Sequence, residues 1–116
     1  MEMDLQIKVK TCDGIPVIEL AGEVDAYTSA RFREVMLDAI ETHGARIVIS
    51  MREVDYIDSS GLGALVGGLK RVSERDGKIV VVCDQPQVRK VFEITGLEKV
   101  FPIFESEDAA LQAVRG

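Results

Sequence analysis

A pair of serines lies where two kinds of sequence pattern meet. Residues 58–63 are Asp-Ser-Ser-Gly-Leu-Gly, after an apolar, β-branched stretch and before a stretch with helical periodicity. Asp and Ser side chains accept hydrogen bonds from the unpaired N–H groups at a helix start, so capping alone predicts a helix beginning here. Gly61 and Gly63 each cost about 1 kcal/mol relative to Ala inside a helix, which indicates that bulk is excluded from this corner.

Nucleophilic catalysis by these serines lacks a base. The single histidine, His43, ends a predicted helix of about 15 residues, roughly 22 Å long, and should emerge at the opposite edge of the molecule. The G-x-S-x-G pattern of hydrolases is also missing, because Ile57 and Asp58 precede Ser59. We therefore predict that the chain is not an enzyme and has no catalytic residues.

Two glycine spacings approach nucleotide-binding motifs without completing them. Gly63 to Gly68 has the G-x-x-x-x-G spacing of a phosphate loop, but Leu69 stands where Lys is required. Gly61-x-Gly63 begins a dinucleotide fingerprint, but Val66 replaces its third glycine. We expect no nucleotide cofactor.

Metal binding is equally unsupported. The carboxylates of Glu53, Asp55 and Asp58 are close enough in sequence to hold Mg²⁺, but no histidine or second regular acidic cluster accompanies them. Cys12 and Cys83 lack C-x-x-C spacing, so we expect free thiols rather than ligands. The sequence predicts no metal site.

Covalent modification is the chemistry that remains. A hydroxyl at a helix N-terminus, flanked by glycine, is accessible to a kinase, and the helix N–H groups can hold the phosphate. The phosphate adds a charge of about −1.5 to −2, and like charges facing each other across an interface cost several kcal/mol. Since about 1.4 kcal/mol is tenfold in affinity, phosphorylation here predicts an on/off switch for binding another protein.

Composition excludes several function classes. The chain has 116 residues, which predicts a single domain over residues 1–116. Its net charge of −6 argues against contact with nucleic acid, which normally requires a basic surface. No apolar run approaches the roughly 18 residues of a membrane span, and the N-terminus lacks the features of a signal peptide. We expect a cytoplasmic protein.

The first half of the chain predicts a hairpin, a helix and a buried strand. Apolar residues alternate over 5–10, and Asp13-Gly14 is a hairpin signal, so a second strand over 15–21 should be antiparallel to the first. A helical pattern follows, with Asp25 or Thr28 as its cap and His43-Gly44 at its end. The short, mostly apolar and β-branched run 46–51 predicts the central strand of a parallel sheet.

The second half alternates helices and strands. The expected elements are a helix over about 60–74, a strand over 78–83, a helix over 86–95, a strand over 101–104 and a helix over 107–114. The order β-β-α-β-α-β-α-β-α predicts an α/β sandwich: a mixed, mostly parallel sheet of about five strands with four helices. Right-handed crossovers should place loops 22–28, 52–60 and 84–87 at one edge.

At this point the sequence resembles a known family. Residues 56–63, together with Gly22-Glu23-Val24-Asp25 and the strand beginning Gly77-Lys78-Ile79, are similar to the bacterial anti-sigma factor antagonists, which are stand-alone STAS domains. The resemblance covers nearly the whole chain. The motif D-S-[ST]-G-L-G, between a central strand and a helix, is far more specific than glycine spacing, and the resemblance implies a STAS-like sandwich.

The resemblance also implies a mechanism. In that family the unphosphorylated protein binds an anti-sigma factor that is also an ATP-binding serine kinase, and this releases the sigma factor. The kinase then phosphorylates the second hydroxyl residue of the motif, which is Ser60 here, and a PP2C-type serine phosphatase restores the binding form. The implied partner-binding residues are Asp25, Asp58, Ser59, Ser60, Gly61, Leu62 and Gly63. A STAS scaffold or transport-complex subunit, and a nucleotide-binding protein, are the alternatives.

Overall fold

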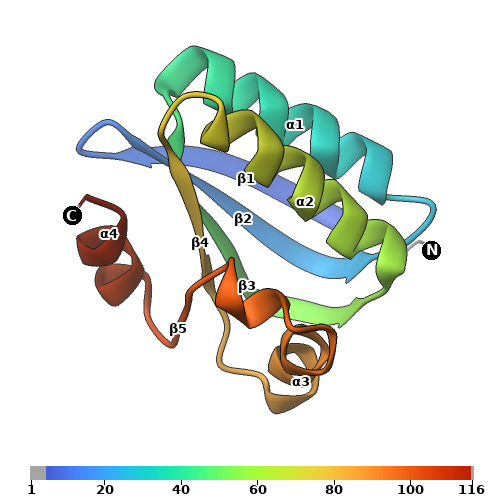
Figure 1. Ribbon diagram of the computed structural model, residues 1–116. Coiled ribbons are helices and arrows are strands. Elements are labelled where there is room, and N and C mark those ends of the chain that lie inside the picture. Colours follow the sequence, from blue (N-terminus) through green and yellow to red (C-terminus); the bar gives the residue numbers. More distant parts are fainter. Residues whose placement is uncertain (1–4, 116) are drawn as a thin grey trace.

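The structure is a computed structural model that describes residues 5–115 (Figure 1). Its elements are β1 (Leu5–Cys12), β2 (Ile15–Val24), α1 (Ser29–His43), β3 (Arg46–Ile57), α2 (Ser59–Ser73), β4 (Lys78–Val82), α3 (Pro86–Thr95), the 3₁₀ turn η1 (Leu97–Lys99), β5 (Ile103–Phe104) and α4 (Glu107–Arg115). The element order and the fold class predicted from the sequence are both confirmed.

The five strands form one sheet in the order β1-β2-β3-β4-β5. β1 and β2 are antiparallel, and the other neighbours are parallel. Asp13 and Gly14 both have positive φ, 52° and 83°, as a tight hairpin turn requires. β3 is the middle strand, and residues 47–51 are all buried, which confirms the central, fully covered strand.

Helices cover both faces of the sheet (Figure 1). α1 and α2 lie side by side on one face, and the largest core cluster includes residues from both of them and from α3. α4 packs on the other face against β3 and β4, over a second, smaller cluster of mostly aliphatic residues. The sheet therefore separates two cores, and the start of α2 belongs to the larger one.

Two strands are longer than the sequence indicated. β2 continues to Val24 rather than ending at residue 21, and β3 continues to Ile57 rather than residue 51. They pair in parallel as far as Val24↔Ile57, with register irregularities between Glu19 and Ala21 and between Gly22 and Glu23. The predicted loop 52–60 is therefore wrong. The irregular register interrupts the period-2 pattern by which a strand is recognised in the sequence.

The longer β3 also changes which loops share an edge. β4 pairs with β3 only as far as Ser50↔Val82, so loop 84–87 ends well short of the start of α2. This loop contacts β3 earlier, where Gln85 Nε2 donates to the Arg52 carbonyl at 2.7 Å. The loops that meet at the start of α2 are thus those after β2 and β3, not three loops as expected.

The C-terminal elements follow the sequence closely. α3 begins at Pro86 and ends before Gly96, whose φ of 77° is the left-handed conformation of a helix C-cap. β5 is shorter than predicted, at two residues, and forms an edge of the sheet just after Pro102. Ser106 Oγ accepts the Ala109 N–H at 3.1 Å, so Ser106 caps α4.

Candidate functional site

Asp58 is the N-cap of α2. Its extended backbone (φ −116°, ψ −170°) precedes the helix, and its Oδ1 accepts the N–H groups of Ser60 at 2.9 Å and Gly61 at 3.2 Å. The Asp58 N–H donates to the carbonyl of Val24 at 3.2 Å, which ties the end of β2 to the start of α2. Of the Asp and Ser residues that could cap this helix, Asp58 is therefore the cap, and Ser60 is the second residue of the helix.

The two serines differ in exposure and surroundings. Ser59, the first residue of α2, is exposed, whereas Ser60 is half-buried. Ser60 lines a groove of about 630 Å³ between α1 and α2, together with Ser29 and Ala30 from the start of α1. Only Ser60 of the pair lines this groove, so phosphorylation of one serine or the other would place the charge in different surroundings.

Gly61 is required by close packing. A Cβ atom added there would lie 2.7 Å from Val24 Cγ1, 2.8 Å from Ile57 Cγ1 and 2.9 Å from the Val24 carbonyl oxygen. Leu62 is also buried, at 8% exposure, within the larger core. Both residues therefore hold the start of α2 against the ends of β2 and β3. That they also contact a partner stays a prediction.

The other glycines of α2 divide into open and packed positions. Gly63 is exposed, and a Cβ there would have no atom within 4 Å. A Cβ on Gly68 would lie 2.6 Å from Met36 Sδ, so α2 packs closely on α1 at that glycine. Gly63 and Gly68 both lie inside a continuous helix, so the G-x-x-x-x-G spacing forms no phosphate loop.

The loop after β2 is held by Asp25 and Thr28. Asp25 Oδ1 accepts the N–H groups of Tyr27 at 2.9 Å and Thr28 at 3.2 Å. The Thr28 hydroxyl donates to the Glu23 carbonyl at 2.9 Å and accepts the Asp25 N–H at 3.0 Å. Thr28 is the N-cap of α1, but its side chain bonds none of that helix's N–H groups. Asp25 and Thr28 thus stiffen the loop rather than cap the helix with their side chains.

Two strand ends bring Asp25 and Asp58 to neighbouring positions. Each aspartate follows directly after one member of the Val24↔Ile57 pair. Tyr27, 95% exposed, and Tyr56, 50% exposed, flank them. Sequence reasoning did not assign a role to Tyr27, although two tyrosines beside the motif loops of a chain with 5% aromatic residues are a usable signal.

The remaining candidates lie elsewhere or form no site. His43 lies at the end of α1, beside Arg46 and Gly77, which confirms its expected separation from the serines. Within residues 5–115, no group of three or more His, Cys, Asp or Glu side chains is placed to hold a metal ion. Cys12 and Cys83 are free thiols, and burial raises the pKa of Cys83.

Comparison with known proteins identifies the family. The family model described as STAS domain matches residues 6–110, and the chain belongs to that family. The anti-sigma F factor antagonist of Paenibacillus polymyxa is 34% identical over 110 residues, covering 94% of each chain. The anti-sigma-B factor antagonist of Listeria monocytogenes is 34% identical over 103 residues, covering 89% of this chain and 90% of the relative.

Solved structures agree with this assignment. An anti-sigma factor antagonist from Mycobacterium paratuberculosis superposes with a TM-score of 0.89 at 28% identity, covering 97% of this chain and 96% of that one. The Bacillus cell fate determinant SpoIIAA in its phosphorylated form has a TM-score of 0.73 at 25% identity, covering 95% and 100%. Among the described residues, no helix is both long and apolar enough to cross a bilayer.

Proposed function

We propose that this chain is an anti-sigma factor antagonist switched by phosphorylation of Ser60. In the unphosphorylated state it binds an anti-sigma factor that is also an ATP-binding serine kinase, and the sigma factor is released. Phosphorylation of Ser60 by that kinase ends binding, and a PP2C-type serine phosphatase restores it. The chain itself has no catalytic role in this scheme and acts in the cytoplasm, as one STAS domain.

The surroundings of Ser60 carry the proposal. Its half-buried side chain lies in the first turn of α2 beside the Asp58 carboxylate, whose Oδ1 accepts the Ser60 N–H. A phosphate added there places more negative charge next to an aspartate at the molecular surface. Relatives named anti-sigma factor antagonists support the function, and a phosphorylated form of SpoIIAA, at 25% identity, supports the modification.

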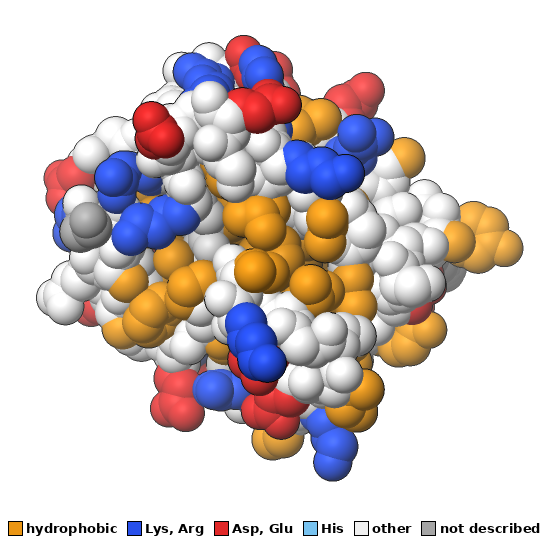
Figure 2. Space-filling model, viewed as in Figure 1, with side chains coloured by type: hydrophobic (Ala, Val, Ile, Leu, Met, Phe, Trp, Pro, Cys, Tyr) orange, Lys and Arg blue, Asp and Glu red, His pale blue; other side chains and the backbone are white. Residues whose placement is uncertain are grey.

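The surface around Ser60 has the composition expected of a protein-binding face. Tyr27 and Tyr56 are exposed there, and tyrosine is enriched in protein interfaces. Figure 2 shows hydrophobic side chains gathered on the face between α2 and α3. Addition of a doubly charged group at the rim of such a surface opposes docking through desolvation and like-charge contact.

The first experiment identifies the partner and the modified residue. The unphosphorylated chain, used as bait in the cell of origin, should recover an ATP-binding serine kinase. That kinase with ATP should then add one phosphate to the chain, measured by intact mass. Ser60→Ala should abolish the gain, whereas Ser59→Ala, the matched control, should keep it. A phosphate retained in Ser60→Ala would refute the site assignment. Recovery of a membrane transporter instead would favour the transport-complex alternative.

The second experiment tests the charge mechanism. Ser60→Asp should weaken kinase binding about 10- to 100-fold by calorimetry, since a like-charge contact costs several kcal/mol and about 1.4 kcal/mol is tenfold. Ser60→Asn has nearly the same size without the charge and should lose much less. Equal losses in the two variants would assign the effect to size and contradict an electrostatic switch. A melting temperature raised by nucleotide alone would support the nucleotide-binding alternative.

A further inference from the structure

The groove between α1 and α2 is the surface that a phosphate on Ser60 would enter. Ser60, Gly63 and Gly67 lie on the same side of α2, three and four residues apart, and all three line the groove. A Cβ on Gly63 would meet nothing within 4 Å, so the space beside Ser60 is open. A group attached to Ser60 Oγ therefore has room along the groove floor.

The start of α2 has fewer free N–H donors for that phosphate than the sequence suggested. Isolated N–H groups at a helix N-terminus bind phosphate well. Here the N–H groups of Ser60 and Gly61 already donate to Asp58 Oδ1, at 2.9 and 3.2 Å. The Asp58 carboxylate would also repel the phosphate. A countercharge must therefore come from elsewhere in the groove.

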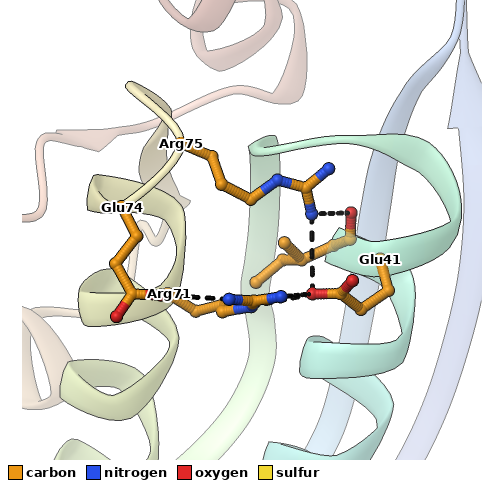
Figure 3. A network of polar contacts seen from close by, with 5 residues as sticks. Glu41, Arg71, Glu74 and Arg75 are labelled. Atoms are coloured by element: carbon orange, nitrogen blue, oxygen red, sulfur yellow. Dashed lines mark hydrogen bonds and ion pairs between the residues drawn. The ribbon is translucent and has the colours of Figure 1, made fainter.

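Three cationic side chains line the groove, and one of them is fully engaged. Arg71 donates through Nε to Glu41 Oε2 at 2.7 Å and through Nη1 to Glu74 Oε1 at 3.0 Å (Figure 3). Arg75 also approaches Glu41, with Nη1 3.5 Å from Oε2, so this network at the far end of the helices has its own carboxylates. Arg71 is not available to a phosphate.

The other two cations, Arg33 and Lys70, form no ion pair with any of residues 5–115. Lys70 is ten residues beyond Ser60, about 15 Å along α2. Arg33 is four residues beyond Ser29, which lines the groove beside Ser60, so its Cα is about 6 Å from that end. Measured by Cα position along its helix, Arg33 is the nearer of the two to the Ser60 end of the groove.

The glycines of α2 leave Arg33 free to move along the groove. Its guanidinium lies over Gly67, where an added Cβ would be 3.1 Å from Nε. Between Ser60 and Gly67, the residues of α2 that line the groove are Gly63, Ala64 and Val66, which have no long side chain, and a Cβ on Gly63 would meet no atom within 4 Å. A flexible arginine can thus turn from Gly67 toward Ser60 without displacing another side chain of α2.

We propose that Arg33 is the intramolecular counter-ion of phosphorylated Ser60, binding the phosphate across the groove from α1 to α2. The inference rests on the proposed phosphorylation of Ser60 and adds the residue that holds the phosphate. Arginine suits the role because its planar fork can donate two parallel hydrogen bonds to phosphate oxygens. The pairing joins the start of α2 to α1 in the phosphorylated form only.

The test uses the intact chain with phosphoserine incorporated at position 60 during translation, so that no kinase is needed. A ³¹P NMR titration measures the second pKa of the phosphate. A nearby cation favours the doubly charged form and lowers this pKa, so Arg33→Gln should raise it by about one unit. Lys70→Gln, the matched control, should leave it unchanged, and Arg33→Lys should fall between, because lysine keeps the charge but not the fork.

The charged groups around the phosphate are Asp58, Arg33, Lys70, Arg71 and Glu74, and all of them influence its second pKa. Because each variant changes one of these groups, the comparison isolates the contribution of Arg33. Equal pKa values in the unsubstituted chain and Arg33→Gln would overturn the proposal. A rise in Lys70→Gln as large as that in Arg33→Gln would also overturn it, because it would indicate general charge rather than a specific pair. Failure of a kinase to modify Ser60 would refute the proposed function and leave this titration interpretable.

Discussion

Alanine substitutions at Gly61 and Gly63 should change stability in opposite directions. Both glycines lie in the first turns of α2, and either substitution removes a residue that disfavours helix by about 1 kcal/mol. At Gly63 the new Cβ enters open space. Gly63→Ala should therefore stabilise the fold by about 0.5–1 kcal/mol.

At Gly61 the same Cβ meets β2. It would lie 2.7 Å from Val24 Cγ1 and 2.9 Å from the Val24 carbonyl oxygen. The methyl group can rotate away, but the carbonyl is strand backbone and accepts the Asp58 N–H. Overpacking of this kind costs about 1–3 kcal/mol, which exceeds the helix gain, so Gly61→Ala should destabilise by about 1–2 kcal/mol.

Urea unfolding followed by far-UV circular dichroism measures both effects. With a slope of about 1–3 kcal/mol per M, the midpoint should fall by roughly 0.5–1 M for Gly61→Ala and rise by roughly 0.3–0.5 M for Gly63→Ala. The slopes should stay equal, because the exposed surface on unfolding is the same. If both midpoints rise, the start of α2 is not packed on β2 as the structure has it.

Other predictions follow from single contacts. Asp58→Ala should cost about 1 kcal/mol through loss of the α2 cap, while Asp58→Asn, which can still accept both N–H groups, should cost much less in the same urea assay. Arg71→Gln should lower the melting temperature slightly in low salt and not in 1 M salt, because its carboxylate partners are exposed. The raised pKa of Cys83 means that the folded state keeps the thiol protonated. Stability should be full below the unfolded pKa of about 8.5 and fall as pH rises above it, a loss that should be absent from Cys83→Ala.

The sequence predicted the fold well because the residues that mark its turns and helix boundaries act locally. Asp13-Gly14, Gly44, Pro86 and Gly96 each mark a turn or a helix end through their own backbone preferences, and the structure places a turn or helix boundary at all four. The central strand was identifiable because four of residues 47–51 are apolar and only Ser50 interrupts the run. These signals need no knowledge of tertiary contacts.

The site was harder to predict because its geometry depends on strand pairing. Residues 52–57 have no regular polarity pattern, and only the register shifts against β2 explain why Val54 and Ile57 are both buried. That extension decides which residue caps α2 and where Ser60 lies. Both Asp58 and Ser60 are suitable caps by type, and the choice between them follows from the position of Ile57, which the sequence alone does not give.

The outer part of β3 also exposes a strand edge. Beyond residue 53 this strand pairs with β2, whereas its pairing with β4 stops at Ser50, so in residues 5–115 no strand covers the other side. An unpaired edge invites a second copy of the chain to add a strand. Glu53 and Asp55 are both exposed there, and the irregular register bends the pair of strands, two features that discourage such addition. Glu53 and Asp55, two of the carboxylates considered for Mg²⁺, thus stand where charge discourages a second copy from pairing with the edge.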